Sequence, residues 1–324
     1  MNSIVTKFTL SKYLLAGLAA MVLLFILPIL LPSYGVSLLT QVLIFGIFAM
    51  SLDLLVGYAG LISFNHATFF GISGYAVGIL ATRGINNFWL SLGVGIAISA
   101  AVAAVIGSMV LRSKGPYFLI ITLAFGQMVF ALAWKWRSLT GGDDGLPGIP
   151  RPEAGLPVSM WKNEYFYYLV LILLVLSFTI LRKLMNSTFG KSVIGVRESE
   201  SRMQSLGYNT WSIKYVTYIL AAVFSGLAGV LHVYYTGFVS PQDLNWTLSG
   251  LVMLMVIIGG AGTLVGPLAG AGIVLIIQNV ISSYTERWQF FMGAIFILCV
   301  MYARHGLAGV IRRKYESIGN KKSL

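Results

Sequence analysis

Residues 37–56 read SLLTQVLIFGIFAMSLDLLV, a stretch of twenty residues in which Asp53 is the one charged side chain. About 20 consecutive apolar residues are enough for a helix to cross the hydrocarbon core of a bilayer. Stretches of this kind recur along the whole chain and leave no room for a soluble domain of any size. We expect spans at roughly residues 13–32, 37–56, 66–82, 89–111, 117–134, 165–181, 214–235, 247–258, 264–283 and 288–303.

The composition agrees with a membrane protein. Hydrophobic residues make up 57% of the 324 positions and charged residues only 10%, whereas an ordinary soluble domain carries about 25% charged residues. The expected fold class is therefore all-α, a polytopic bundle of about ten spans. We expect one membrane domain over residues 13–310, between a cytoplasmic N-terminus, 1–12, and a basic cytoplasmic tail, 311–324.

The net charge of +12 is distributed as a membrane orientation signal. With a cytoplasmic N-terminus, 16 of the 22 lysine and arginine residues fall inside and six fall outside. This asymmetry is what the positive-inside rule requires, and it predicts that both termini are cytoplasmic. The basicity thus indicates orientation and not a nucleic-acid partner. The six outside residues are Arg83, Lys135, Arg137, Arg151, Lys162 and Arg287.

Two polar segments separate the spans. The outer one, 135–164, contains TGGDDGLPGIPRPE, and this density of glycine and proline predicts turns and not a helix. The cytoplasmic one, 182–213, predicts a short amphipathic helix that ends at Gly207, with Asn209 as the cap of the next helix. Its apolar residues recur at helical spacing among charged ones. They are Val193, Val196, Met203 and Leu206.

Two glycine-rich turns repeat the pattern Gly-x-Ala-Gly, at 57–60 and 259–262. Transporters often interrupt helices at such places, where backbone groups can face a solute path. The alternative is that the glycines only allow helices to pack closely. We favour packing for Gly262, Gly266 and Gly270, which are four residues apart. Both interpretations stay open for 57–66, where polar side chains gather.

Enzyme motifs are lacking in the sequence. The three histidines, His66, His232 and His305, are far apart, and the single cysteine, Cys299, lies in an apolar run. The sequence Gly190-Lys191-Ser192 fails as a phosphate loop because Met185 stands where the first glycine is required. We expect no catalytic residue, no metal site and no cofactor bound by this chain.

Asp53 is the one acidic residue expected inside a span. It could cap a half-helix, bond a neighbouring helix or carry a proton, and only the last would favour an ion-coupled carrier. A channel-like facilitator is a further alternative. The charged cytoplasmic helix favours docking into the groove of a soluble partner, and a partner that hydrolyses ATP could then move the spans.

Six stretches, in order along the chain, resemble the LivM-type permease of branched-chain amino acid ABC importers. The similarity runs in order along nearly the whole chain, from about residue 40 to residue 310, and six ordered matches are more specific than any single glycine motif. The stretches are GYAGLISFNHATFFGISGY (57–75), YFLIITLAFGQM (117–128), WRSLTGGDDGLPGIP (136–150), FGKSVIGVRESESRMQSLGYN (189–209), FSGLAGVLHVYYTGFVSP (224–241) and IIGGAGTLVGPLAGA (257–271).

The resemblance implies a complex in the inner membrane with a second related permease, two cytoplasmic ATPase subunits that bind ATP, and an extracytoplasmic solute-binding protein. It implies import of leucine, isoleucine or valine by alternating access. Urea and short amides are the alternative substrates, because their importers use similar permeases. Three groups of residues follow. The ATPase-coupling group is Arg197, Glu198, Glu200, Arg202, Leu206 and Gly207; the path group is Asp53, Gly57, Gly60, Ser63, Asn65 and His66; the binding-protein group is Asp143, Asp144 and Gly145.

The chain departs from the family pattern in places. Asn65 stands where the family commonly has glycine before the histidine, and Leu61 where glutamine is frequent. In the cytoplasmic helix, much of an alanine-rich stretch is replaced by Ser201, Arg202, Met203 and Gln204. A polar-to-apolar change beside a solute path could alter substrate preference, and the helix changes could alter the choice of ATPase.

Overall fold

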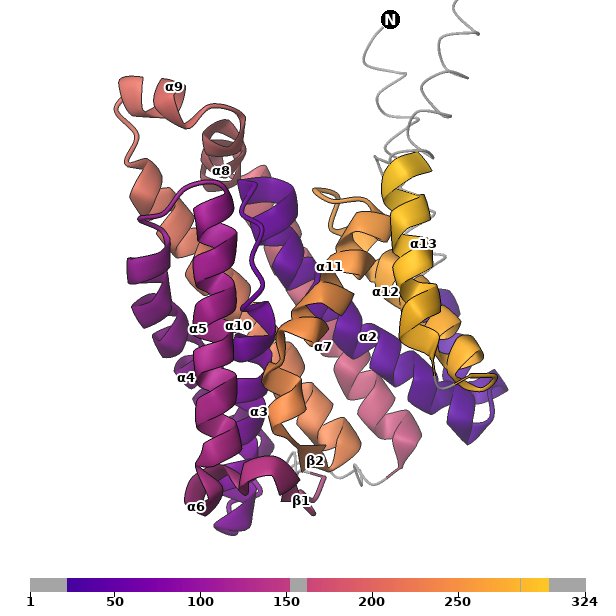
Figure 1. Cartoon of the computed structure of the whole chain (residues 1–324). Coiled ribbons are helices and arrows are strands. Elements are labelled where there is room, and N and C mark those ends of the chain that lie inside the picture. The colour runs from indigo at the N-terminus through magenta and orange to yellow at the C-terminus, as the bar shows by residue number, and fades with distance from the viewer. Residues whose placement is uncertain (1–21, 152–161, 286, 303–324) are drawn as a thin grey trace, which may run out of the picture.

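The computed structural model describes residues 22–151, 162–285 and 287–302. In this part of the chain the fold is helical, as expected, and Figure 1 shows a bundle with α8 and α9 at one end and α6, β1 and β2 at the other. The long helices are α2 (Ser33–Asp53), α3 (His66–Thr82), α4 (Phe88–Val110), α5 (Pro116–Lys135), α7 (Asn163–Asn186), α10 (Thr210–Thr236), α11 (Trp246–Gly259), α12 (Val265–Ser282) and α13 (Trp288–Tyr302).

Six helices in the described residues are long and apolar enough to cross a membrane: α2 with its continuation to Ala59, α4, α5, α7, α10 and α12. The expected spans at 66–82, 247–258 and 288–303 correspond to α3, α11 and α13, which are shorter, with 17, 14 and 15 residues. Residues 13–21 of the expected first span lie outside the described residues, as do 1–12, 152–161 and 303–324.

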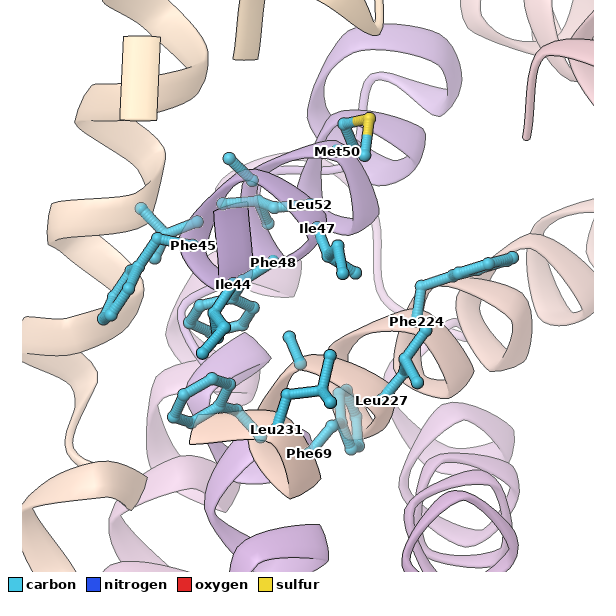
Figure 2. Packing of buried hydrophobic residues seen from close by; sticks show 14 of the residues in the cluster. Ile44, Phe45, Ile47, Phe48, Met50, Leu52, Phe69, Phe224, Leu227 and Leu231 are labelled. Carbon is cyan, nitrogen blue, oxygen red and sulfur yellow. The ribbon is translucent and has the colours of Figure 1, made fainter. Parts of the chain in front are cut away.

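The centre of the bundle is formed by α2 and α10. Within the most apolar 18 residues of each helix, 83% of the residues are buried in α2 and 72% in α10. The corresponding share in α5 is 22%. α2 packs against α7, α10 and α12, while α10 packs against α3 and α4. Figure 2 shows apolar side chains of α2, among them Ile44 and Phe48, across from Phe69 of α3 and Leu231 of α10. A helix that is apolar all round, as α2 is, fits such a buried position.

Glycines allow the closest helix contacts, as the packing interpretation predicted. A Cβ on Gly270 would overlap the carbonyl oxygen of Met255, so α12 lies directly on the backbone of α11. A Cβ on Gly229 would overlap the carbonyl oxygen of Phe70, where α10 crosses α3. Small residues serve this purpose between membrane helices, where van der Waals contact replaces the hydrophobic effect.

The end of α2 changes its winding. From Leu54 to Ala59 the helix continues as a π-helix and stops at Gly60, whose φ is +70°. A π-helical turn is rare and often marks a functional site, and a left-handed residue at a helix end is usually glycine. The expected span 37–56 is therefore correct in place but is three residues short at its C-terminal end.

Both polar segments contain structure that the sequence did not predict. The outer one forms the short helix α6 (Arg137–Thr140), a 3₁₀ turn η2 (Gly142–Asp144) and a two-residue strand β1 (Leu146–Pro147). β1 pairs antiparallel with β2 (Phe238–Val239). α6 precedes the glycine- and proline-rich stretch 140–153 except for its last residue, Thr140.

The second polar segment, 182–213, contains two helices instead of one, α8 (Thr188–Glu198) and α9 (Glu200–Ser205). The break lies at the extended residue Ser199, whose side chain accepts a bond from the Arg202 amide and so caps α9. Val193 and Val196 are buried, but Leu206 is 67% exposed. The expected continuous apolar face is therefore wrong beyond the break, while Gly207 and Asn209 end one helix and cap the next as expected.

The Gly229→Ala substitution should separate α10 from α3, because the new methyl group meets the Phe70 carbonyl and the Ser73 hydroxyl. We expect a loss of about 1–3 kcal/mol in stability, as for other overpacked sites, measured by thermal unfolding of the purified protein. Gly93→Ala in α4 is the matched control, since nothing lies within 4 Å of its added Cβ. Equal melting temperatures for the two variants would contradict this packing.

Candidate functional site

Asp53, the last residue of α2, is fully buried and holds a distant turn. Its carboxylate accepts hydrogen bonds from the amides of Gly262 at 2.6 Å and Leu264 at 3.2 Å. These amides immediately precede α12, where the helix dipole favours a negative charge. Asp53 therefore bonds a neighbouring element, one of the three roles that the sequence left open.

The turn that Asp53 binds is strained. Leu264 has φ 58° and ψ −43°, and the Val265 amide donates to the Thr263 carbonyl at 2.7 Å across it. This is a γ-turn with positive φ, which is rare and strained for a residue with a side chain. Such a conformation persists only when its surroundings determine it, and here the Asp53 carboxylate is bonded to the amide of the strained residue.

The two Gly-x-Ala-Gly turns touch each other. A Cβ on Gly57 would overlap both the Gly262 amide nitrogen and the Asp53 carboxylate. A Cβ on Gly262, whose φ is +81°, would lie 3.3 Å from the Gly57 carbonyl oxygen. The repeated pattern thus reflects mutual contact, because each turn needs a glycine where the other approaches.

Arg197 brings the cytoplasmic segment to the same point. Its guanidinium donates a hydrogen bond to the Gly57 carbonyl oxygen, and its Cγ would lie 3.0 Å from a Cβ on Gly60. We call the contact of Asp53, Gly57, Arg197, Gly262 and Leu264 the coupling junction. It joins α8, the end of α2 and the start of α12.

A second polar cluster lies where the chain enters α3. The side chains of Ser63 and Asn65 are fully buried, and the Ser63 hydroxyl donates to the side-chain oxygen Oδ1 of Asn65 at 2.6 Å. The Asn65 amide nitrogen donates to the Tyr218 hydroxyl at 2.7 Å. Buried amides require such partners. Asn65 finds this partner in α10, which joins the start of α3 to that helix.

His66 is held on three sides. Its Nε2 lies 2.7 Å from the Ser51 hydroxyl, which itself donates to the Phe48 carbonyl at 2.6 Å. Ser51 has one hydroxyl proton, so when it is donated to the Phe48 carbonyl, Nε2 carries the imidazole proton and donates to Ser51. The ring stacks on Phe48 with centroids 5.4 Å apart, and the His66 carbonyl accepts from Ser225 at 3.2 Å.

The six residues assigned to the solute path differ in exposure. Asp53, Gly57, Ser63, Asn65 and His66 are buried within this subunit, and Gly60 is exposed. The buried members hold the segment 57–66 in place, through the bond of Asn65 to α10 and the bonds of Asp53 to the turn before α12. The neighbouring Ile62 is 46% exposed. Their assignment to the path stays a prediction.

The docking group extends from α8 through α9. Glu198, Arg202, Leu206 and Gly207 are exposed. Glu200 is paired instead: its carboxylate lies 2.8 Å from the Lys214 ammonium and 3.8 Å from that of Lys114. Burial alone would raise the pKa of Glu200, but the bond and charge of Lys214, together with Lys114, outweigh it and lower the pKa below its ordinary value.

The group expected to contact a binding protein lies at the opposite end of the bundle (Figure 1). Asp143 and Asp144 are exposed on the η2 turn. Gly145 is buried, and a Cβ there would overlap the Val239 carbonyl oxygen. The pairing of β1 with β2 therefore fixes the position from which the two carboxylates project.

Comparison with known proteins identifies the family. Residues 34–300 match the family described as branched-chain amino acid transport system / permease component. The chain belongs to this family. With its apolar helices, the chain is a multi-pass permease of the cell membrane.

The relatives of this permease are distant in sequence. It is 27% identical over 307 residues to the high-affinity branched-chain amino acid transport system permease protein LivM of Salmonella typhimurium, covering 88% of this chain and 72% of the relative. A probable LivM of Methanocaldococcus jannaschii is 26% identical over 300 residues, 80% of this chain and 86% of that one. LivH of Escherichia coli is 22% identical over 285 residues, 82% and 91% of the two chains. No solved structure matched the permease.

Sequence reasoning missed several residues of these clusters. Tyr218 and Ser51 lie in apolar spans, 153 and 15 residues from the partners they contact, and a lone hydroxyl in a span gives no signal of its partner. Leu264 carries no sign of its conformation either. The pairing of Lys214 with Glu200 was the exception that the sequence could have predicted. Lys214 lies at a span boundary, and Glu200 precedes it in the same loop.

The Glu200→Gln substitution should lower the stability of the folded permease at neutral pH by up to about 1 kcal/mol, as for other exposed ion pairs. A carboxylate with a lowered folded pKa stabilises the fold above its unfolded pKa, and this stability is lost as the pH falls through the folded pKa. The difference in melting temperature between wild type and variant should stay constant from pH 7.5 to 5 and shrink only below about 4.5, the ordinary value. A difference that already shrinks at pH 6 would show that the pKa is not lowered.

Proposed function

We propose that this permease carries leucine, isoleucine and valine into the cell as one membrane subunit of an ATP-driven importer. The match to the branched-chain family over residues 34–300 carries this proposal. The named relatives support the substrate class, because LivM and LivH proteins of three species are described as branched-chain amino acid permeases. Urea or short amides are the substrates to test against.

The proposed assembly follows from the two ends of the bundle. About ten spans with both termini in the cytoplasm place α8 and α9 inside and Asp143 outside, and the excess of lysine and arginine at the α8 end supports this orientation. Two ATPase subunits would dock on α8 and α9, a solute-binding protein near the η2 turn, and a second related permease beside this one.

Transport in this proposal is alternating access without a catalytic residue or a cofactor bound by this chain. ATP is bound and hydrolysed by the partner subunits, and docking moves α8. Because Arg197 bonds Gly57, and Gly57 lies on Gly262, displacement of α8 acts on the ends of α2 and α12 together. Packed elements that have two discrete arrangements can amplify such a small shift.

A secondary carrier driven by protons receives less support. Both carboxylate oxygens of Asp53, its candidate proton site, already accept backbone hydrogen bonds. This arrangement favours a structural role for the carboxylate. The proposed path instead follows the exposed residues near Gly60 and the partner permease, with the buried members of 57–66 as their support.

The Arg197→Gln substitution should uncouple the importer, because the shorter amide side chain cannot reproduce the guanidinium bond to Gly57. The complex should assemble and hydrolyse ATP, while the number of leucine molecules transported per ATP falls at least about fivefold, a typical coupling energy. The ratio is measured in proteoliposomes that contain the whole importer. Lys191→Gln, an exposed cation on the same helix, is the control and should keep the ratio. An unchanged ratio in Arg197→Gln would exclude this transmission route.

Uptake of labelled leucine tests the function itself. Cells that lack this permease and any second leucine importer should lose uptake and regain it when the gene is restored. Unlabelled isoleucine and valine should compete, and urea should not. Unchanged leucine uptake on deletion would remove this substrate, and restored urea uptake would then assign the permease to the alternative class.

A further inference from the structure

One exposed side of α7 carries a continuous apolar stripe. Ile172, Leu176 and Ile180 follow each other at four-residue intervals and are 65%, 53% and 45% exposed. Residues four apart lie above one another on one face of a helix. This stripe therefore leads along α7 toward its C-terminal end, where α7 meets α8.

A shallow depression lies where the stripe ends. It has a volume of about 540 Å³ and is lined by Phe178, Thr179, Arg182, Lys183, Asn186 and Ser187. Arg182 follows Phe178 by four residues, and Lys183 follows Thr179 by four, so two neighbouring rows of α7 pass from apolar or hydroxyl side chains to cations. Ser187 caps the N-terminus of α8, whose dipole adds a partial positive charge at the same place.

The two cations have no counter-charge within the described residues. Neither Arg182 nor Lys183 has a carboxylate within 4.0 Å in residues 22–151, 162–285 and 287–302, whereas Lys114 and Lys214 share Glu200. Both side chains are exposed, as is Asn186, and their donors make no hydrogen bond to another described residue. Two adjacent cations without an acceptor indicate a place for an anion from outside the chain.

We propose that this depression binds the phosphate of an anionic phospholipid of the cytoplasmic leaflet. Arg182 and Lys183 would hold the phosphate, the Asn186 amide would donate to the headgroup, and the acyl chains would lie along Ile172, Leu176 and Ile180. The adjoining apolar stripe favours a lipid over free phosphate, because free phosphate has no acyl chain that could cover the stripe. Basic pockets on the cytoplasmic side of membrane helices bind anionic headgroups in this way, and each cation there increases binding roughly fivefold.

Quenching by brominated lipids tests this site in the assembled importer. A fluorophore attached at Ile180→Cys, in a Cys299→Ser background, reports which lipid occupies the stripe. Dibrominated phosphatidylglycerol should displace phosphatidylcholine there with an affinity roughly five- to thirtyfold higher. Arg182→Gln with Lys183→Gln should bring the two affinities to equality, while Arg112→Gln with Lys191→Gln, the same loss of charge at other exposed sites, should keep the preference.

Four results would overturn the proposal. Equal affinity for the two lipids in the unmodified pocket would exclude a headgroup site, and a preference that survives in the Arg182, Lys183 variant would place it elsewhere. Loss of the preference on addition of millimolar inorganic phosphate would assign the pocket to free phosphate. Quenching by neither lipid would show that a partner protein covers it. None of these results bears on the amino acid that the importer carries, so the lipid site and the transport function are tested separately.

Discussion

The structure depends on how one carboxylate is satisfied where water is scarce. Backbone and side-chain polar groups at membrane depth need partners within the protein, and Asp53 and the turn before α12 supply each other: the carboxylate takes two amides, and the amides gain an acceptor. Without the carboxylate the γ-turn at Leu264 would have no reason to persist. Without the turn, α2 would end in an unpaired buried charge. The π-helical end of α2 and the close approach of α11 and α12 both lie around this one contact.

Close backbone contact then joins the helices near the α8 end of the bundle. Gly57 against Gly262, and Gly270 against Met255, leave no side chain between the elements that could yield. Protein interiors of this density transmit displacement instead of absorbing it. Arg197 extends the same contact to α8 by a single hydrogen bond, on a side chain that is itself exposed. Gly57 therefore takes part in two contacts: a buried one with Gly262 and an accessible one, through its carbonyl, with Arg197.

Much of the fold could be predicted from the sequence, because hydrophobic length and glycine position are local signals. α3 begins and ends where expected, and α4, α5, α11, α12 and α13 agree to within one residue. Predictions failed where a single residue or a distant partner determines the local secondary structure. Ser199 breaks the cytoplasmic helix and so exposes Leu206, and β1 forms only because β2 lies beside it. For the site, the sequence correctly singled out Asp53 and Asn65 as polar residues in apolar surroundings. It could not reveal Gly262 or Tyr218 as their partners, since pairing across 209 and 153 residues is set by the packed bundle.

The distance along the chain between Asp53 and its partners has a consequence for synthesis. A protein is made from its N-terminus, so α2 enters the membrane before the ribosome has reached Gly262, 209 residues later. Through that interval the carboxylate has no amide to bind, and burying it unpaired in lipid is unfavourable. The early helices therefore cannot reach their final arrangement alone. They must stay in the insertion machinery or in contact with water until α11 and α12 are made. The last part of the chain thus supplies the hydrogen-bond donors that the first part needs.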